Sequence, residues 1–206
     1  MRADLDPAAL IADLADWRPI LVRSEAQDRA TFLQRPDLGR RLAREFAEAL
    51  SPGTYDATIV IADGLSAGAV QVQTAQLCKM LMAAQNFVFA PPVVALQARV
   101  ALGDEIAARQ GAALAVVLIG ERPGLSSRDS VGAYLTFDPK PGETKDAERN
   151  CVSNIGGHGL SLDEASRRIL AIMALARTLR RTGTSLKEDE ALVLLPPVPG
   201  TLNELA

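Results

Sequence analysis

Charged and hydroxyl side chains gather in one loop near the middle of the chain, where the apolar run ALAVVLI breaks into GERPGLSSRDS. Glu121 and Arg122 stand between Gly120 and Pro123, of which the proline restricts the backbone, and Ser126 and Ser127 follow closely. A carboxylate at Glu121 can accept hydrogen bonds from hydroxyl or amide groups of a ligand. Because α/β proteins bind ligands beyond the carboxyl ends of their strands, we expect this loop to line a ligand site.

A second polar turn, with Asp63, Gly64 and Ser66, follows the β-branched run ATIVIA. Adjacent strands would bring the two turns together around one crevice. Neither turn contains G-x-G-x-x-G or G-x-x-x-x-G-K-S/T, which disfavours ordinary dinucleotide and P-loop binding. Structural alternatives stay open: an Asx-turn with a helix cap at Asp63 and Ser66, a helix N-cap in the loop serines, and a surface ion pair of Glu121 with Arg122.

Composition limits the function classes. The 206 residues are 48% hydrophobic, enough for one sizeable core or a main domain with a helical appendage. A net charge of −3 and 4% aromatic residues argue against nucleic acid or an anionic membrane as the partner. No apolar stretch reaches membrane length, and residues 1–17 lack the basic-then-apolar order of a signal peptide. These features predict a cytoplasmic protein without a membrane segment.

Histidine and cysteine are scarce. Cys78 and Cys151 could form at most one disulfide, and in a reducing compartment we expect both to remain thiols. One histidine and two distant cysteines do not make a structural zinc site, so no metal site is predicted. A hydrolase with a Ser or Cys nucleophile would need His158 as its only imidazole base, which disfavours that class.

The order of the patterns predicts an α/β fold, with a Rossmann-like, largely parallel sheet flanked by helices. We divide the chain into a helical N-terminal segment (1–53), the Rossmann-like domain (54–182) and a Pro-rich C-terminal tail (183–206). Leu10, Leu14 and Trp17 favour a helix packed on its own domain over a docking peptide. Strands are predicted at 57–62, 112–119 and 135–137, and helices at 40–50, 66–84, 104–110 and 162–181, with residues 18–35 looping into a further helix.

Five blocks of sequence, in this order, carry a specific resemblance: DRATFLQRPDLGRRLA, IVIADGLSAGAV, RVALGDEI, VVLIGERPGLSSRDSVGAYLTF and DAERNCVSNI. Together they resemble the small subunit of ethanolamine ammonia-lyase over most of residues 18–181. The segment 72–89, the Pro-rich end and the short N-terminal region match that family less well, which puts the strength of the partner interaction and the identity of the substrate in question.

The resemblance implies an adenosylcobalamin-dependent lyase that converts ethanolamine to acetaldehyde and ammonia. In that family the cobalamin lies between the small subunit and a larger TIM-barrel subunit, which carries the catalytic residues, so this chain would be inactive alone. The small subunit lines the nucleotide side of the corrinoid. The matching motif positions are Val100, Glu121 and Cys151. Packaging in a bacterial microcompartment is left open.

Residue types support these assignments unequally. Alone, Val100 would suggest a core residue and Cys151 a buried structural thiol, and only the resemblance assigns both to the cofactor. The backbone at Gly120 and the hydroxyl of Ser126 could meet a phosphate or amide group of the cofactor. Arg122 could form an ion pair with the phosphate of the cofactor or with a carboxylate of the partner subunit. Asp63 and Ser66 could complete the polar wall of the same site.

The lower ligand of the cobalt is also predicted. Base-off corrinoid enzymes present a histidine within D-x-H-x-x-G, whereas His158 lies in GGHG without that aspartate. The cofactor is therefore expected to stay base-on, keeping its own dimethylbenzimidazole, with His158 as a loop residue. The alternative function is a non-catalytic corrinoid- or nucleotide-binding protein of the same fold. A stand-alone NAD- or phosphosugar-binding enzyme is disfavoured by the missing fingerprints.

Overall fold

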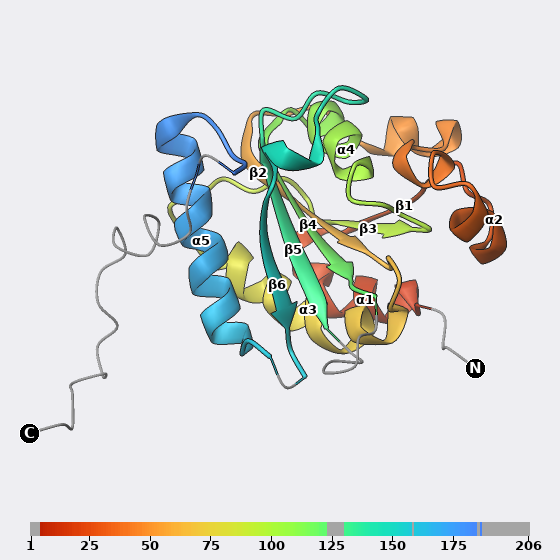
Figure 1. Cartoon of the computed structure of the whole chain (residues 1–206), viewed down its shortest axis with the longest axis horizontal. Helices are drawn as coiled ribbons and strands as arrows, with labels where there is room; N and C mark the ends of the chain where they lie inside the picture. The colour runs from red at the N-terminus through yellow and green to blue at the C-terminus, as the bar shows by residue number, and fades with distance from the viewer. Residues whose placement is uncertain (1–4, 123–129, 158, 185, 187–206) are drawn as a thin grey trace, which may run out of the picture.

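A six-stranded sheet forms the centre of the computed structural model, which describes residues 5–122, 130–157, 159–184 and 186 (Figure 1). The strand order is β1-β3-β2-β4-β5-β6. β1, β3, β2 and β4 run parallel to their neighbours, and β5 and β6 are antiparallel. The strands are β1 (Ile20–Arg23), β2 (Tyr55–Ala62), β3 (Val93–Leu96), β4 (Ala112–Gly120), β5 (Val131–Phe137) and β6 (Asn150–Ile155).

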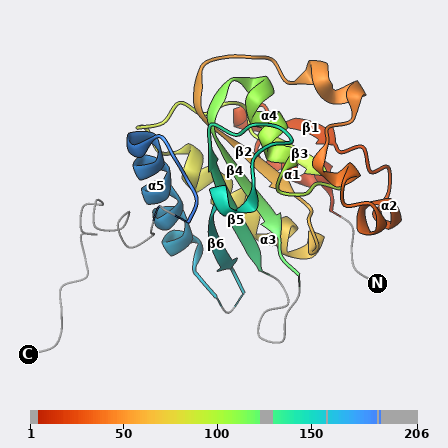
Figure 2. The same ribbon diagram turned by 45° about the horizontal axis from the view of Figure 1, so that its top comes forward.

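Helices cover both faces of this sheet, and Figure 2 shows α4 across the sheet from α3. The alternation of side chains along β2 explains the two layers: Ile59 and Ile61 pack with α1, α3 and α5, while Val60 and Ala62 pack with α4. The helices are α1 (Pro7–Asp13), α2 (Arg29–Gln34), α3 (Ala67–Met82), α4 (Leu102–Gln110) and α5 (Leu162–Leu179), with 3-10 turns η1 (Ala15–Trp17), η2 (Leu38–Arg40), η3 (Arg44–Ala49) and η4 (Asp146–Glu148).

The winding of the parallel strands creates the place for a site. The chain passes from β2 through α3 to β3 on one side, and then through α4 back across β2 to β4. The two connections therefore leave the sheet on opposite faces, and a crevice forms beyond the carboxyl ends of β2 and β3. The predicted α/β class with a helix-flanked sheet is confirmed, and the finer Rossmann-like likeness stays a prediction.

Several predicted elements are confirmed by their caps and packing. Gly111 ends α4 in the left-handed conformation, with φ of 71°. The hydroxyl of Ser161 accepts a hydrogen bond from the backbone N–H of Glu164 at 3.2 Å, which starts α5. Leu10 and Leu14 are fully buried in the core cluster that contains α3, as expected for a helix packed on its own domain.

Other expectations for the secondary structure were wrong. Residues 18–35 do lead into the predicted helix, α2, but the expected loop before it contains β1, so the N-terminal segment is not helical throughout, and Val22 of β1 joins the core beside β2. Residues 40–50 form only the 3-10 turn η3, because Ala43 is drawn to β1 by its N–H, which donates to the Arg23 carbonyl at 3.0 Å. β6 was not predicted, and β5 and β6 make the last third of the sheet antiparallel rather than parallel. Within the described ranges, no helix is both long and apolar enough to cross a bilayer.

Candidate functional site

A cavity of about 530 Å³ opens where β2, β3 and β4 end. Each parallel strand contributes the residues that follow it, as doubly wound sheets require. The walls include Gly64 after β2, Arg99 and Val100 after β3, and Glu121 and Arg122 after β4. Phe32 of α2 and Tyr134 of β5 complete them.

The two polar turns that were predicted to converge lie in direct contact. The N–H of Leu65 donates to the carbonyl oxygen of Gly120 at 2.9 Å. A Cβ atom added at Gly120 would lie 2.3 Å from the carbonyl oxygen of Ser66 and 2.7 Å from that of Asp63. Only a glycine at this position lets the two turns meet so closely.

Glu121 enters the cavity in a fixed orientation. Its Oε2 accepts a hydrogen bond from the hydroxyl of Ser130 at 2.8 Å and one from the backbone N–H of Asn154 at 3.1 Å. Its Oε1 lies beside Gly132, where an added Cβ would be 2.9 Å away. In the described part of the chain Glu121 forms no ion pair with Arg122, so the alternative of a simple surface pair is wrong. The carboxylate is a rigidly held acceptor for a ligand.

Cys151 lies on β6 directly opposite Tyr134, which lines the cavity. Burial, the Cys151 thiol with its hydrogen bond, and the Glu121 carboxylate raise the pKa of the Tyr134 hydroxyl to about 12. Neither cysteine is in a disulfide, as predicted, and Cys151 is exposed whereas Cys78 is buried. The alternative of a buried structural thiol therefore fits Cys78 and not Cys151.

Asp63 and Ser66 sit behind the cavity and are not among its described lining residues. The buried Asp63 carboxylate accepts hydrogen bonds from three backbone N–H groups, those of Gly64 at 2.9 Å, Gln97 at 2.9 Å and Ala98 at 3.0 Å. Burial raises the pKa of Asp63 against the lowering effect of these bonds. Asp63 thus fixes the loop that carries Arg99, while Ser66 occupies the N-cap position of α3 without a capping side-chain bond.

Several residues of the cavity wall escaped the sequence analysis, among them Phe32, Arg99 and Tyr134. Two guanidinium groups stack on the Phe32 ring, with Cζ atoms 4.8 Å (Arg29) and 4.3 Å (Arg99) from its centroid. Arg99 stands directly before Val100, in a block already singled out, yet nothing in the sequence connects it with Phe32. Ser126, Ser127 and His158 lie outside the described residues.

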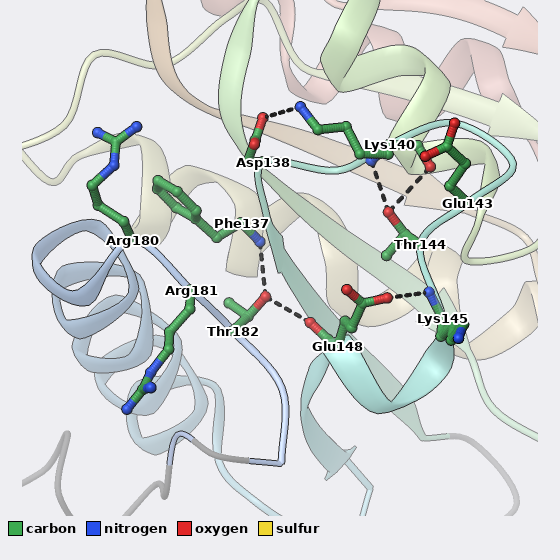
Figure 3. A pocket seen from close by; sticks show the side chains of 10 residues that line it. All are labelled: Phe137, Asp138, Lys140, Glu143, Thr144, Lys145, Glu148, Arg180, Arg181 and Thr182. Atoms are coloured by element: carbon green, nitrogen blue, oxygen red, sulfur yellow. Dashed lines mark hydrogen bonds and ion pairs between the residues drawn. The ribbon is translucent and has the colours of Figure 1, made fainter.

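A second cavity, of about 510 Å³, lies at the opposite edge of the sheet, near the end of α5 (Figure 3). Two of its charged groups pair with each other, Lys140 with Asp138 at 2.8 Å, and the Glu148 carboxylate accepts a hydrogen bond from the backbone N–H of Lys145 at 2.7 Å. Figure 3 shows the Arg181 side chain directed away from Lys140. Its cations do not converge, and the first cavity is the stronger candidate. Within the described residues, no cluster of His, Cys, Asp and Glu could hold a metal ion.

Comparison with known proteins agrees with the sequence blocks. The family model for the ethanolamine ammonia-lyase light chain matches residues 1–187. Curated relatives described as ethanolamine ammonia-lyase small subunit include one from Pseudomonas fluorescens, 46% identical over 95% of this chain and 75% of its own length. Another, from Rhodopseudomonas palustris, is 48% identical over 93% of this chain and 76% of its own length. One from Xanthomonas campestris is 44% identical over 92% of this chain and 74% of its own length.

Proposed function

The chain belongs to the ethanolamine ammonia-lyase light chain family, and from this premise we propose that it is the small subunit of an adenosylcobalamin-dependent ethanolamine ammonia-lyase. As a small subunit it acts together with a larger subunit, for which we propose a catalytic TIM barrel. Adenosylcobalamin supplies a carbon–cobalt bond whose homolysis initiates elimination of ammonia from ethanolamine. In this proposal the present chain binds and orients the cofactor, and its residues take no part in bond breaking.

The chemistry of the first cavity fits a cobalamin. The corrin carries amide side chains whose N–H groups suit the carboxylate of Glu121. Val100 and Tyr134 offer apolar surface for the benzimidazole, and the backbone at Gly120 allows close approach. The cationic side chain of Arg122 suits the phosphodiester of the nucleotide arm.

The observation that supports the proposal is that Val100 and Glu121, from two different segments of the chain, line one cavity. Cys151 is not among the described lining residues, but it pairs on β6 with Tyr134, which is one of them. A cavity of about 530 Å³ suits a drug-sized ligand and would enclose only part of a corrinoid. This supports a shared site, in which the present chain supplies one wall and the larger subunit supplies the rest. The base-on state of the cofactor belongs to the same proposal.

Co-expression with the large subunit from the same source tests the proposal. We expect the two chains to co-purify and to form acetaldehyde from ethanolamine only when adenosylcobalamin is added. Glu121→Ala should weaken adenosylcobalamin binding by about tenfold or more, because the corrin amides lose a charged acceptor. Glu143→Ala, at the exposed rim of the second cavity, is the matched control and should bind normally. A chain that binds adenosylcobalamin but never joins a large subunit would instead support the non-catalytic binding protein.

A further inference from the structure

Arginines outnumber carboxylates at the first cavity: Arg99 and Arg122 line it together with Glu121, and Arg29 and Arg40 lie close enough to repel Arg99. Within the described ranges, Arg29, Arg40, Arg99 and Arg122 form no ion pair with an acidic side chain. Burial, followed by repulsion from Arg40, Arg29 and Arg122, lowers the pKa of Arg99, and only Asp63 acts in the opposite direction. Concentrated positive charge of this kind attracts an anion.

Arg99 is the arginine that the fold holds most firmly. Its guanidinium stacks on the Phe32 ring, and Nη2 donates to the Phe32 carbonyl oxygen at 3.1 Å. Its backbone N–H donates to the carbonyl oxygen of Gly39 at 2.8 Å. Its Nε is buried and has no hydrogen-bond partner among the described residues. A buried donor without a partner is costly, and Arg99 is at the same time a residue of the cavity wall, which is consistent with a ligand at this position.

The side chain of Arg99 has room in this position because residue 39 is a glycine. A Cβ added at Gly39 would lie 2.9 Å from Cγ of Arg99 and 3.2 Å from Cδ2 of Phe32. Arg29 also stacks on the Phe32 ring, and its Nη1 donates to the carbonyl oxygen of Gly64 at 2.6 Å. The guanidinium groups are thus oriented before any ligand arrives, which reduces the entropy lost on binding.

We propose that Arg99, with Arg29 also stacked on the Phe32 ring, binds the phosphate group of the ligand in this cavity. The inference rests on the proposed function, because the phosphodiester of the nucleotide arm is the anionic group that cobalamin offers. The planar guanidinium presents several N–H donors in a geometry that matches phosphate oxygens. Arg99 is a binding residue in this proposal, and Asp63 positions it by holding the backbone of Gln97 and Ala98.

Binding of inorganic phosphate to the full chain tests the anion site without cobalamin. In a titration at constant ionic strength, followed by NMR of the arginine Nε–H signals, we expect the Arg99 signal to shift and saturate. Because Arg99→Met lacks the Arg99 signal itself, the test in this variant is that phosphate no longer shifts the signals of the neighbouring Arg29 and Arg122 saturably. Arg35→Met, which removes an exposed arginine paired with Asp37 on the protein surface, should retain all these shifts. Equal responses from the two variants would overturn the inference.

The assembled two-subunit complex gives the second test, with three ligands. We expect Arg99→Met to weaken adenosylcobalamin and adenosylcobinamide phosphate by about 10- to 150-fold, the range for a hydrogen bond to a charged group. Adenosylcobinamide, which lacks the phosphate, should bind the variant and the wild type within about twofold. Arg99→Lys keeps the charge but loses the planar donors, and should lie between the two. Equal weakening of all three ligands would mean that Arg99 only shapes the cavity.

The two proposals fail in different ways. If the wild-type complex binds adenosylcobalamin and Arg99→Met binds it equally well, the phosphate assignment is wrong and the lyase function stands. If the wild-type complex binds no cobalamin but the Arg99 signal still saturates with phosphate, the cobalamin function is wrong and the anion site belongs to another phosphate ester. Thermal melting of each variant, compared with Arg35→Met, separates lost binding from lost folding.

Discussion

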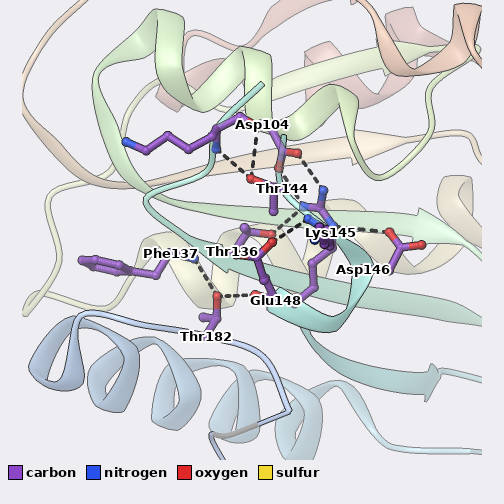
Figure 4. Close-up of polar contacts among 10 residues, drawn as sticks. Asp104, Thr136, Phe137, Thr144, Lys145, Asp146, Glu148 and Thr182 are labelled. Carbon is purple, nitrogen blue, oxygen red and sulfur yellow. Dashed lines mark hydrogen bonds and ion pairs between the residues drawn. The ribbon is translucent and has the colours of Figure 1, made fainter. Parts of the chain in front are cut away.

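Arg149→Met should destabilise the protein strongly, because it leaves a buried carboxylate without its partner. The Asp104 and Arg149 side chains are 1% and 2% exposed. Nη1 and Nη2 of Arg149 lie 2.7 Å and 2.6 Å from the two oxygens of Asp104, and Nη1 also lies 2.7 Å from the Thr136 hydroxyl. Figure 4 shows Asp104 and Thr136 in this network.

The magnitude follows from this geometry. Removing one partner of a buried ion pair costs about 3–5 kcal/mol. Asp104 lies in the first turn of α4, where the helix dipole favours a negative charge by up to about 1 kcal/mol. We therefore expect Arg149→Met to lower the free energy of unfolding by about 3 kcal/mol. Asp104→Leu should lower it more, because the buried guanidinium of Arg149 loses its main acceptor. The double variant should recover most of the loss, since apolar side chains can replace a buried pair.

Urea unfolding followed by circular dichroism and by the fluorescence of Trp17, the single tryptophan, measures these free energies. Arg35→Met, which removes the exposed pair with Asp37, is the control and should leave the free energy of unfolding close to that of the wild type. A loss below about 1 kcal/mol for Arg149→Met, or a double variant as unstable as the sum of the single ones, would refute the reasoning.

Three further predictions concern the site and the thiols. Gly120→Ala should push the two cavity turns apart and weaken adenosylcobalamin binding in equilibrium titrations, whereas Gly68→Ala, with nothing within 4 Å of its added Cβ, should keep binding and raise the melting temperature slightly. A chromogenic disulfide reagent should label the exposed Cys151 of the isolated chain at once and the buried Cys78 only on unfolding; rapid labelling of both thiols would contradict the burial. Burial raises the pKa of Cys78 from 9.0 to about 12, so unfolding releases its proton above pH 9 and stability should fall as pH rises from about 9 to 12. Cys78→Ser should flatten this dependence in denaturation curves, and Cys151→Ser should not.

The sequence predicted β2 and β4 because their signal is local. Both are runs of β-branched and apolar residues, and Gly111 and Ser161 mark helix ends by their own chemistry. The central strand β3 was not predicted, because its four residues are too few for a period. β1 is equally short, and in β6 the two buried positions, Val152 and Ile155, are three residues apart, which breaks the alternation of a regular strand. The edge strands form because they pair with a neighbouring strand. A local sequence pattern does not show such pairing.

Site residues were predicted where a polar residue directly follows a strand. They were missed where segments far apart in the sequence come together in the fold. Glu121 follows the strongest strand, so its place at the carboxyl edge was evident. Arg99 and Phe32 are separated by 67 positions and come together only through the packing of α2 on the loop after β3. Asp63 was predicted as part of a ligand wall, but its oxygens are occupied by three backbone N–H groups. Which way a buried carboxylate faces depends on tertiary structure.

The outer strands of the sheet bear on how the chain behaves before it meets a partner. β1 is short, and β6 turns Cys151, Ser153 and Asn154 toward solvent. Short or polar edges offer little template for another strand and so oppose aggregation. Aggregation threatens the subunit of a hetero-oligomeric enzyme whenever it is synthesised before its partner. With such edges the folded chain would stay monomeric until its partner is made. The two subunits would then associate through side-chain contacts and not by adding a strand to the sheet.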